Sequence, residues 1–342
     1  MGKKILVTGG TGFIGSHTVV ELHKAGYTPV IVDNLSNSSA KIIDQLEKII
    51  GERPEFHEFD LCDEAKTTAF LAANSDISGI IHFAAFKAVG ESVQKPLEYY
   101  HNNFVSLFNI LNVYKERPIN FVFSSSCTVY GQPDVLPVNE AAPVKKAESP
   151  YGNTKQVAEE ILSETAAVNK NYQIISLRYF NPVGAHESAL IGELPLGVPQ
   201  NLVPFITQTA VGKREKITVF GDDYDTPDGS CIRDYIHVVD LAKAHVAAIK
   251  RMEEGRSKDN YEVFNVGTGK GSSVLEVIQA FEKSTGEKLN YVIGPRRDGD
   301  IEKVFGDVTK SLNELGWKAE LGVDEMMKSA WEWELYIKNN PI

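Results

Sequence analysis

The sequence predicts an α/β protein with a doubly wound parallel sheet and a smaller second α/β lobe. Through the first half of the chain, short β-branched or aromatic runs alternate with longer amphipathic segments. This alternation is typical of a parallel sheet wrapped by helices on both faces. Beyond about residue 181, glycine and proline are scattered along the chain, which indicates a loop-rich lobe. Because no clean linker separates residues 1–180 from 181–342, we expect one compact unit with a cleft.

The expected elements follow in chain order. The first part predicts strands at residues 4–8, 29–33, 55–59, 79–84, 120–124 and 173–178. The amphipathic segments between them predict helices at residues 16–25, 96–114 and 151–169. Further helices, at residues 239–254 and 273–283, would complete the lobe. Ligands of such sheets bind beyond the carboxyl ends of the strands, so we expect the functional residues there.

Length and charge limit the class of protein. The chain has 342 residues, 35 Lys and Arg, 46 Asp and Glu, and a net charge of −11. Its length suits two domains, or one large fold with a lobe. Its charge disfavours nonspecific binding to nucleic acid or to anionic membranes. An anionic ligand must therefore be held by local arginines, backbone amides or helix ends.

Cysteine usage indicates the compartment. The three cysteines, Cys62, Cys127 and Cys231, include no Cys-x-x-Cys pair. This argues against a disulfide framework and a structural zinc site, and it fits a cytoplasmic protein. We therefore expect no metal. No apolar stretch approaches the ~18 residues of a membrane span, so we also expect no membrane anchor.

A glycine-rich turn follows the first expected strand. It reads Thr8-Gly9-Gly10-Thr11-Gly12-Phe13-Ile14-Gly15 and opens the first expected helix. Such glycines let backbone amides approach a pyrophosphate, which the positive end of the helix attracts. Asp33, at the end of the second strand, can bond ribose hydroxyls and would repel a 2′-phosphate. Glycine-rich turns also exist only to turn the chain, but the whole arrangement favours a Rossmann-type NAD site.

A second pattern combines hydroxyl groups with a tyrosine and a lysine. Ser124-Ser125-Ser126 ends the fifth expected strand, where ligands bind. Tyr151 and Lys155 are four residues apart in an expected helix, so they share one face. The plain alternatives are serines that cap a strand and a surface lysine beside a ring. Together, Ser126, Tyr151 and Lys155 favour a catalytic site.

Tyr151 would have to act as a base near neutral pH. A free tyrosine has a pKa near 10, so this pKa must fall by about three units, equivalent to ~4 kcal/mol. One ammonium at ~4 Å, in an effective dielectric of ~20, supplies roughly that energy. We therefore expect Lys155, together with the positive ring of NAD, to lower the pKa of Tyr151.

Longer stretches of the chain resemble a known family. They are residues 8–17, Lys87-Ala88-Val89-Gly90-Glu91-Ser92-Val93, Tyr179-Phe180-Asn181-Pro182-Val183-Gly184-Ala185-His186, Arg233-Asp234-Tyr235-Ile236-His237 and Arg296-Arg297-Asp298-Gly299-Asp300. Through them the chain resembles the extended short-chain dehydrogenase/reductase family and, within it, the UDP-galactose 4-epimerases. The resemblance implies interconversion of UDP-galactose and UDP-glucose through a transient 4-keto sugar, with no net redox change.

The resemblance also implies roles for single residues. Tyr151 takes the proton of the sugar 4-hydroxyl while the C4 hydride moves to NAD, and Ser126 bonds the reacting oxygen. The implied NAD residues are Gly9, Gly12, Phe13, Ile14, Gly15, Asp33, Asn34, Asp60, Leu61, Phe83, Ala84, Lys87, Asn102, Tyr151, Lys155 and Phe180. The implied UDP-hexose residues are Ser126, Thr128, Tyr151, Asn181, Asn201, Leu202, Phe220, Arg233, Tyr235, Arg297, Asp300 and Val304. Arg233 and Arg297 offer bidentate donors to a diphosphate, although a lone arginine more often forms a surface salt bridge.

One departure from the family concerns substrate range. Some of these epimerases carry a tyrosine four residues past Asp300, where this chain has Val304. A smaller side chain should widen the pocket near the hexose 2-position. We therefore expect activity on UDP-N-acetylglucosamine and UDP-N-acetylgalactosamine as well. The alternative is a core valine, with Phe305 filling the space. Cys127 stands where relatives often have alanine, and we expect it to be a buried residue without chemistry.

Three rival functions remain open. A nucleotide-sugar 4,6-dehydratase would share the fold but needs an Asp-Glu pair where this chain has Ser126-Cys127-Thr128. A noncatalytic NAD-binding sensor would not need the Ser, Tyr and Lys set. A metal enzyme would have to use His237, Asp240 and His245, whose spacing does not place all three on one helix face.

The resemblance also implies a homodimer. Its candidate interface consists of the helices at residues 96–114 and 151–169, although an apolar helix face can equally belong to the core.

Overall fold

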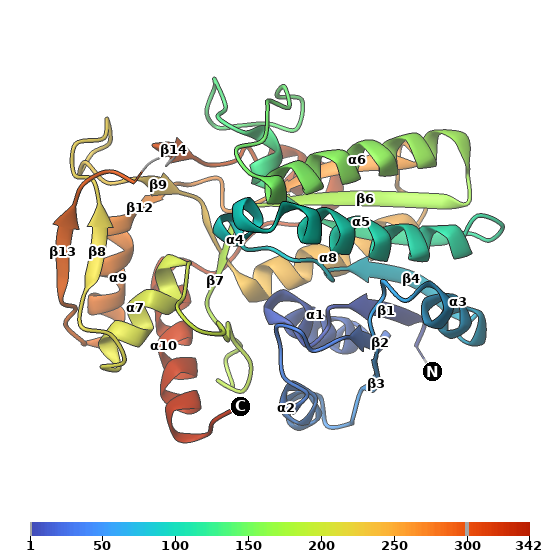
Figure 1. Cartoon of the computed structure of the whole chain (residues 1–342), viewed down its shortest axis with the longest axis horizontal. Coiled ribbons are helices and arrows are strands. Elements are labelled where there is room, and N and C mark those ends of the chain that lie inside the picture. Colours follow the sequence, from blue (N-terminus) through green and yellow to red (C-terminus); the bar gives the residue numbers. More distant parts are fainter. Residues whose placement is uncertain (1, 298–300) are drawn as a thin grey trace.

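The computed structural model describes residues 2–297 and 301–342, and a seven-stranded parallel sheet forms its centre (Figure 1). The strands run in the order β3-β2-β1-β4-β5-β6-β11. Their bounds are β1 Lys4–Thr8, β2 Thr28–Asp33, β3 Glu55–Glu58, β4 Ile77–His82, β5 Ile119–Ser126, β6 Tyr172–Tyr179 and β11 Tyr261–Val266. The order changes direction between β1 and β4, which marks the topological switch point of a doubly wound sheet. The expected fold class is therefore confirmed.

Side chains of the central strands alternate between two separate cores. In β1, Ile5 and Val7 belong to one buried cluster, whereas Leu6 belongs to the other. Successive residues of a strand point to opposite faces, so the sheet separates the two cores. Because both faces are covered, β1 reads as a continuous apolar run, as parallel strands do.

Helices cover both faces of the sheet (Figure 1). The face of Ile5 is covered by α1 (Phe13–Lys24), α2 (Lys41–Ile50) and α8 (Val238–Glu253). The face of Leu6 is covered by α3 (Glu64–Ala73), α5 (Pro96–Val113) and α6 (Pro150–Val168). The helices expected at residues 16–25, 96–114 and 151–169 are therefore confirmed, with small shifts at their ends.

Helix α6 begins at a well-defined cap. Ser149 is its N-cap, and the side chain accepts a hydrogen bond from Gly152 N. Pro150 occupies the first helical position, where the missing N–H costs nothing. This start places Tyr151 and Lys155 in the first two turns.

The smaller lobe lies at one end of the sheet (Figure 1). Its third core combines apolar residues from α7 (Leu202–Ala210), α9 (Val274–Thr285) and α10 (Val323–Asn339). Short strands pair here instead of forming one sheet. The pairs are β7 (Asn181–Val183) with β10 (Tyr235–His237), β8 (Ile217–Phe220) with β13 (Tyr291–Gly294), and β9 (Ile232–Arg233) with both β12 (Ser272–Ser273) and β14 (Lys303–Val304).

The chain beyond residue 180 is not confined to this lobe. Strand β11 pairs with β6 at one edge of the central sheet. Helix α8 packs on the Ile5 face, where Leu241 and Ala244 join the core that α1 also lines. The expectation that the helix at residues 239–254 completes the lobe is therefore wrong, because its apolar stripe covers the sheet. The division at residue 180 stays a prediction.

Candidate active site

The glycine-rich turn between β1 and α1 is tightly packed. Gly9 has a φ of +69°, in the region that favours glycine. A Cβ at Gly15 would lie 2.2 Å from Gly9 O, so α1 begins in contact with the turn. Gly12 is the N-cap residue of α1, a helix that the structure describes in full. No side chain caps this helix, and its first turn holds no carboxylate. The positive end of α1 thus suits a ligand phosphate.

Asp33 ends β2 beside this turn, and it is only 7% exposed. Its carboxylate accepts hydrogen bonds from Thr11 N at 3.1 Å and Leu35 N at 2.9 Å. The next residue, Asn34, donates to Asp60 Oδ2 at 3.0 Å. The structure therefore brings Asp33, Asn34 and Asp60 to one edge of the sheet.

The other expected NAD residues follow neighbouring strands. Phe83 and Ala84 follow β4 and donate backbone hydrogen bonds to the last residue of β1. Leu61 follows β3, and the thiol of the next residue donates to the Asn102 carbonyl of α5 at 3.6 Å. Phe180 follows β6 and is buried. All of these residues gather at the carboxyl ends of the strands, where the sequence predicts a ligand.

The three expected catalytic side chains converge at the end of β5. Ser126 is the last residue of β5, and its side chain lies near enough to the Tyr151 phenol to act on the pKa of that phenol. Lys155 Nζ lies 5.9 Å from the centroid of the Tyr151 ring. It donates to Ser124 O at 2.6 Å. The i, i+4 spacing on α6 therefore directs both side chains to one point of the sheet.

Burial sets the direction of the pKa shifts of Tyr151 and Lys155. Burial raises the pKa of Tyr151 to about 12, although the side chain of Ser126 opposes this shift. Burial also lowers the pKa of Lys155 to about 8, against the charge of Glu159. In the protein alone, loss of hydration dominates, and the Lys155 ammonium already donates to Ser124 O. The predicted fall in the pKa of Tyr151 requires Lys155 together with NAD, so it stays a prediction for the NAD-bound protein.

Thr128 adds a polar atom that is ready for a ligand. It lies in the short helix η1 (Cys127–Tyr130), directly after β5. Its Oγ1 is buried and has no hydrogen-bond partner among residues 2–297 and 301–342. A buried polar atom left without a partner costs about 1–3 kcal/mol. This supports the prediction that Thr128 contacts the substrate.

Four expected UDP-sugar residues meet on short strands. Asn181 of β7 pairs with Tyr235 of β10, and Arg233 of β9 pairs with Val304 of β14. Asp234 joins these pairs, because its carbonyl accepts from Asn181 N at 3.0 Å and its amide donates to Val304 O at 3.1 Å. Residues far apart in the sequence thus become neighbours.

The Asp234 side chain holds this arrangement together. It is fully buried and accepts hydrogen bonds from Thr268 N at 2.8 Å, Gly269 N at 3.1 Å and Gly306 N at 3.3 Å. The Thr268 hydroxyl donates as well, at 2.6 Å. Burial raises the pKa of Asp234 although these bonds oppose the shift. Asp234 was not among the residues expected at the site, although it lies inside the Arg233–His237 motif.

Phe220 and Arg297 form a separate group at the outer end of the lobe. Phe220 ends β8, and the Arg297 guanidinium carbon lies 5.5 Å from its ring centroid. The ring is 41% exposed and so offers a flat surface to a base. Asp300, expected beside them, lies outside the described residues.

The Glu193 carboxylate lies between Lys87, an expected NAD residue, and Asn201, an expected UDP-sugar residue. Asn201 is the N-cap residue of α7, which begins at Leu202, and its Nδ2 donates to Glu193 Oε1 at 2.7 Å. Lys87 Nζ lies 3.7 Å from the same oxygen. Glu193 could not be predicted from the sequence, because no local pattern distinguishes it from other loop carboxylates.

Val304 is part of a small apolar cluster. It is 5% exposed and packs with Val129, Tyr130, Val138 and Phe180. Val129 and Tyr130 belong to η1, so the volume of residue 304 bears on the packing of the short helix that carries Thr128.

Two absences concern only the part of the chain that the structure describes. No group of three or more His, Cys, Asp or Glu side chains there could hold a metal ion. No helix there is long and apolar enough to cross a membrane. The residues of the metal alternative have local partners, since His245 Nδ1 bonds Leu241 O and Asp240 Oδ2 accepts from Glu320 N.

Comparison with known proteins identifies the family. Over 332 residues, the chain is 49% identical to a UDP-glucose 4-epimerase from Dictyostelium discoideum, with 97% of this chain and 95% of the relative covered. It is 48% identical over 338 residues to a UDP-glucose 4-epimerase from Haemophilus influenzae, with 98% of each covered. The chain belongs to the UDP-glucose 4-epimerase family. The resemblance stated from the sequence motifs is therefore confirmed.

Solved structures of epimerases share the fold. The Stenotrophomonas maltophila UDP-glucose-4-epimerase, solved with bound NAD and formylated UDP-arabinopyranose, has a TM-score of 0.95 at 45% identity, with 99% of each chain covered. The Bifidobacterium longum epimerase, in complex with NAD+ and UDP, has a TM-score of 0.92 at 48% identity, with 98% of this chain and 99% of that chain covered.

One comparison carries the name of a rival function. A family model described as GDP-mannose 4,6 dehydratase matches residues 6–330. The site does not favour dehydration, because the stretch at the end of β5 is Ser126-Cys127-Thr128 and has no carboxylate to move the protons of an elimination. The epimerase relatives also match across the whole chain, so the dehydratase alternative is not favoured.

Proposed function

We propose that this chain is an NAD-dependent epimerase that interconverts UDP-galactose and UDP-glucose. The observation that carries the proposal is the convergence of Ser126, Tyr151 and Lys155 at the ligand-binding edge of the sheet. The names of the relatives agree with this activity. A noncatalytic sensor would have no use for this set of side chains.

The residues at the switch point fit NAD. A side chain at Gly15 would collide with the turn, and the carboxylate of Asp33 stands at the end of β2. Such a site holds a pyrophosphate on amides and a ribose on the carboxylate. When bound, NAD supplies an acceptor for the C4 hydride, which it later returns, and a positively charged ring.

Tyr151 moves the proton. It takes the proton of the sugar 4-hydroxyl while the C4 hydride leaves, so the sugar becomes a 4-ketone. Ser126 hydrogen-bonds the same oxygen. Because burial raises the pKa of Tyr151, the transfer depends on positive charge near the phenol, which Lys155 and the cofactor ring provide. After the ketone presents its other face, the hydride returns and Tyr151 gives the proton back.

The lobe holds the UDP part of the substrate. Arg233 and Arg297 supply local cations for the diphosphate in a protein whose net charge is −11. Phe220 presents its exposed ring to the uracil face. Thr128 offers its buried hydroxyl near the sugar.

The proposal is tested with the purified protein and UDP-galactose. UDP-glucose should form without an added oxidant, because the hydride returns to the sugar. Tyr151→Phe should lower kcat about 10²- to 10⁴-fold with an unchanged fold. Tyr336→Phe on α10 is the matched control and should keep the parent rate. Undiminished turnover by Tyr151→Phe would contradict the proposal.

We also propose that the enzyme accepts UDP-N-acetylhexosamines. Val304 pairs with Arg233 and packs with two residues of η1, so the size of its side chain acts on both segments that are expected to hold the sugar. Val304→Tyr should remove turnover of UDP-N-acetylglucosamine while turnover of UDP-galactose persists. Thermal unfolding of the variant controls for overpacking in this cluster. Equal turnover of the N-acetylated sugar by parent and variant would reject the idea.

We infer that two copies of the chain pair through α5 and α6. An apolar stripe on α5 supports this, because Leu97 is 81% exposed and Phe108 is 40% exposed. Tyr100, Phe104 and Phe108 form a ladder, with ring centroids 5.8 and 6.1 Å apart. Sedimentation should give a dimer for the parent and a monomer for Phe108→Glu. A parent that sediments as a monomer would refute the pairing.

We propose a cytoplasmic location. The three cysteines are free thiols, which suits a reducing compartment. Cell fractionation with an antibody to the protein tests this, and recovery in a secreted fraction would contradict it.

A further inference from the structure

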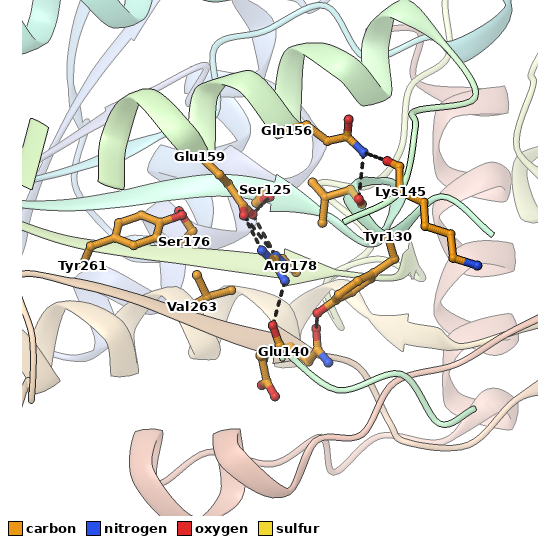
Figure 2. Close-up of polar contacts among 12 residues, drawn as sticks. Ser125, Tyr130, Glu140, Lys145, Gln156, Glu159, Ser176, Arg178, Tyr261 and Val263 are labelled. Carbon is orange, nitrogen blue, oxygen red and sulfur yellow. Dashed lines mark hydrogen bonds and ion pairs between the residues drawn. The ribbon is translucent and has the colours of Figure 1, made fainter. Parts of the chain in front are cut away.

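A buried ion pair joins α6, the helix that carries Tyr151 and Lys155, to β6 (Figure 2). Glu159 of α6 accepts hydrogen bonds from Arg178 of β6, with Nε to Oε1 at 3.0 Å and Nη2 to Oε2 at 2.5 Å. The hydroxyl of Ser125, on β5, donates to the same carboxylate. The two charged side chains are 7% and 8% exposed. A single carboxylate thus ties α6 to two strands of the sheet.

The three elements that Glu159 joins also carry the catalytic groups. On α6, Tyr151, Lys155 and Glu159 are spaced by four residues and so share one face. Ser125 precedes Ser126 on β5. A change at Glu159 therefore acts on the rotation of α6 relative to the strand that holds Ser126.

The same network reaches the segment that follows β5. The Arg178 guanidinium carbon lies 4.9 Å from the centroid of the Tyr130 ring, and Nη1 donates to Glu140 O at 3.3 Å. Gln156 Nε2, one turn before Glu159 on α6, donates to Val129 O at 2.8 Å. Figure 2 shows these groups converging from α6, β6 and η1. The network therefore holds η1, and with it Thr128, against α6.

Stability alone does not account for this pair. Two charges lose their hydration when they are buried, and an apolar pair of similar volume is often equally stable or more stable. Apolar residues such as Ala158 and Leu162 already fill the core beneath the same helix. We therefore expect the geometry and the charge of this buried pair to serve a function other than stability.

We propose that Glu159, held by Arg178 and Ser125, is a positioning residue for the epimerisation, which fixes Tyr151 against Ser126 and keeps the Lys155 ammonium charged. This inference rests on the proposed function.

The charges around Lys155 give the direction of the effect. The groups that face it are Tyr151 and Glu159 on α6, His82 on β4 and the carbonyl of Ser124 on β5. Burial lowers the pKa of Lys155 to about 8, and the charge of Glu159 opposes this shift. Burial, together with the charge of Lys155, lowers the pKa of His82 to about 3, so His82 stays neutral. Tyr179 on β6 bonds Ser124 and is neutral as well, because burial raises its pKa. Removal of the Glu159 charge therefore lets Lys155 lose its proton at a lower pH.

The test compares Glu159→Gln with Glu160→Gln, its exposed neighbour on α6. Two quantities are measured between pH 6 and pH 10: kcat on UDP-galactose, and the fraction of protein that retains NAD through gel filtration. For Glu159→Gln, we expect the alkaline limbs of both profiles to move to lower pH by about one unit. We also expect kcat at pH 8.5 to fall about tenfold. Glu160→Gln should follow the parent in both profiles.

Two further variants separate charge from structure. Glu159→Asp keeps the charge and should keep the parent's alkaline limb even where kcat falls. The double variant Glu159→Leu/Arg178→Met replaces the ion pair with apolar side chains and should fold even if Glu159→Gln does not. We expect its alkaline limbs to move to lower pH as well. Profiles of the double variant that coincide with those of the parent would overturn the proposal.

The outcomes distinguish this inference from the proposed function. A parent protein that does not convert UDP-galactose refutes the proposed function, and the pH profile of NAD retention still tests Glu159. A parent that is active, with profiles unmoved by Glu159→Gln, refutes the role of Glu159 alone.

Discussion

Many of the expected NAD residues lie at the carboxyl ends of strands of one continuous sheet. Five of the expected UDP-sugar residues lie instead on paired strands of two to four residues, namely Asn181, Phe220, Arg233, Tyr235 and Val304. At the sheet, Gly9 directly follows β1 and Asp33 ends β2, so each reaches the site from its own strand. In the lobe, Arg233 and Val304 become neighbours only through pairing across the chain. The sheet therefore provides a frame for its site, while the lobe depends on a few buried contacts such as Asp234.

The largest effect is expected from Gly15→Ala, which tests the NAD site at the sheet. Its Cβ would lie 2.2 Å from Gly9 O, so the turn must open and its amides must move. We expect NAD affinity to fall at least ~100-fold, equivalent to about 3 kcal/mol, while the lobe stays folded. Equilibrium NAD binding measures the loss. Gly322→Ala, at the start of α10, is the control, and equal losses in the two variants would break the comparison.

Asp234→Asn tests the lobe in the same way. The amide cannot accept the bonds that Asp234 Oδ2 accepts from Gly269 N and Gly306 N, and unpaired buried groups cost about 1–3 kcal/mol each. We expect KM for UDP-galactose to rise about 10- to 100-fold, with NAD retention unchanged. Asp324→Asn, which removes an exposed pair with Lys283, should change little. A variant that loses NAD instead would show that the two regions are not independent.

A smaller effect is expected where the two regions meet. His237 caps α8 on the sheet, and its Nε2 bonds Ser329 of α10 in the lobe. Burial lowers the pKa of His237 to about 4, although Asp240 opposes the shift. The folded protein therefore keeps this histidine neutral, while the unfolded chain takes up a proton below about pH 6.5. Its contribution is fully present above that pH and is lost as the pH falls towards 4.

Urea unfolding at pH 7 and pH 5 measures the contribution of His237 to the free energy of unfolding. Stability should fall by up to about 2 kcal/mol from this residue over that interval. His237→Asn keeps a capping oxygen but does not titrate, so it should reduce the pH dependence by that amount. His101→Asn, at an exposed position of α5, is the control. If the free energy of unfolding of His237→Asn changes between pH 7 and pH 5 as much as that of the parent, His237 is not the source of the acid sensitivity.

The smallest expected effect is at the rim of the lobe. Phe220→Ala removes an exposed ring beside Arg297, and stacking of a base on such a ring is worth about 1–3 kcal/mol. We expect the Kd for UDP to rise about tenfold with kcat unchanged. Calorimetric titration with UDP measures it, with Tyr291→Phe as the control. An unchanged Kd would remove Phe220 from the uracil site and leave that role to another part of the lobe.

The sheet could be predicted from sequence because its signals are local. Each strand is a short apolar run, and α1 and α6 begin at a glycine turn and at Ser149-Pro150. The placement of α8 was mistaken, because an amphipathic stripe shows that a helix covers something and does not show what it covers. The high pKa of Tyr151 in the protein alone could not be predicted either, since the depth of burial is not visible in a spacing of four residues.

The sequence by itself determined the parallel sheet, the glycine turn and the Ser126, Tyr151 and Lys155 set, because each depends on spacing within one turn, strand or helix. Only the tertiary structure decided which carboxylates support these groups. Asp234, Glu193 and Glu159 receive their partners from distant segments, and a buried charge is defined by everything that surrounds it. The physical reason is that periodicity fixes the face on which a side chain lies, whereas its hydration and charge depend on contacts across the whole fold.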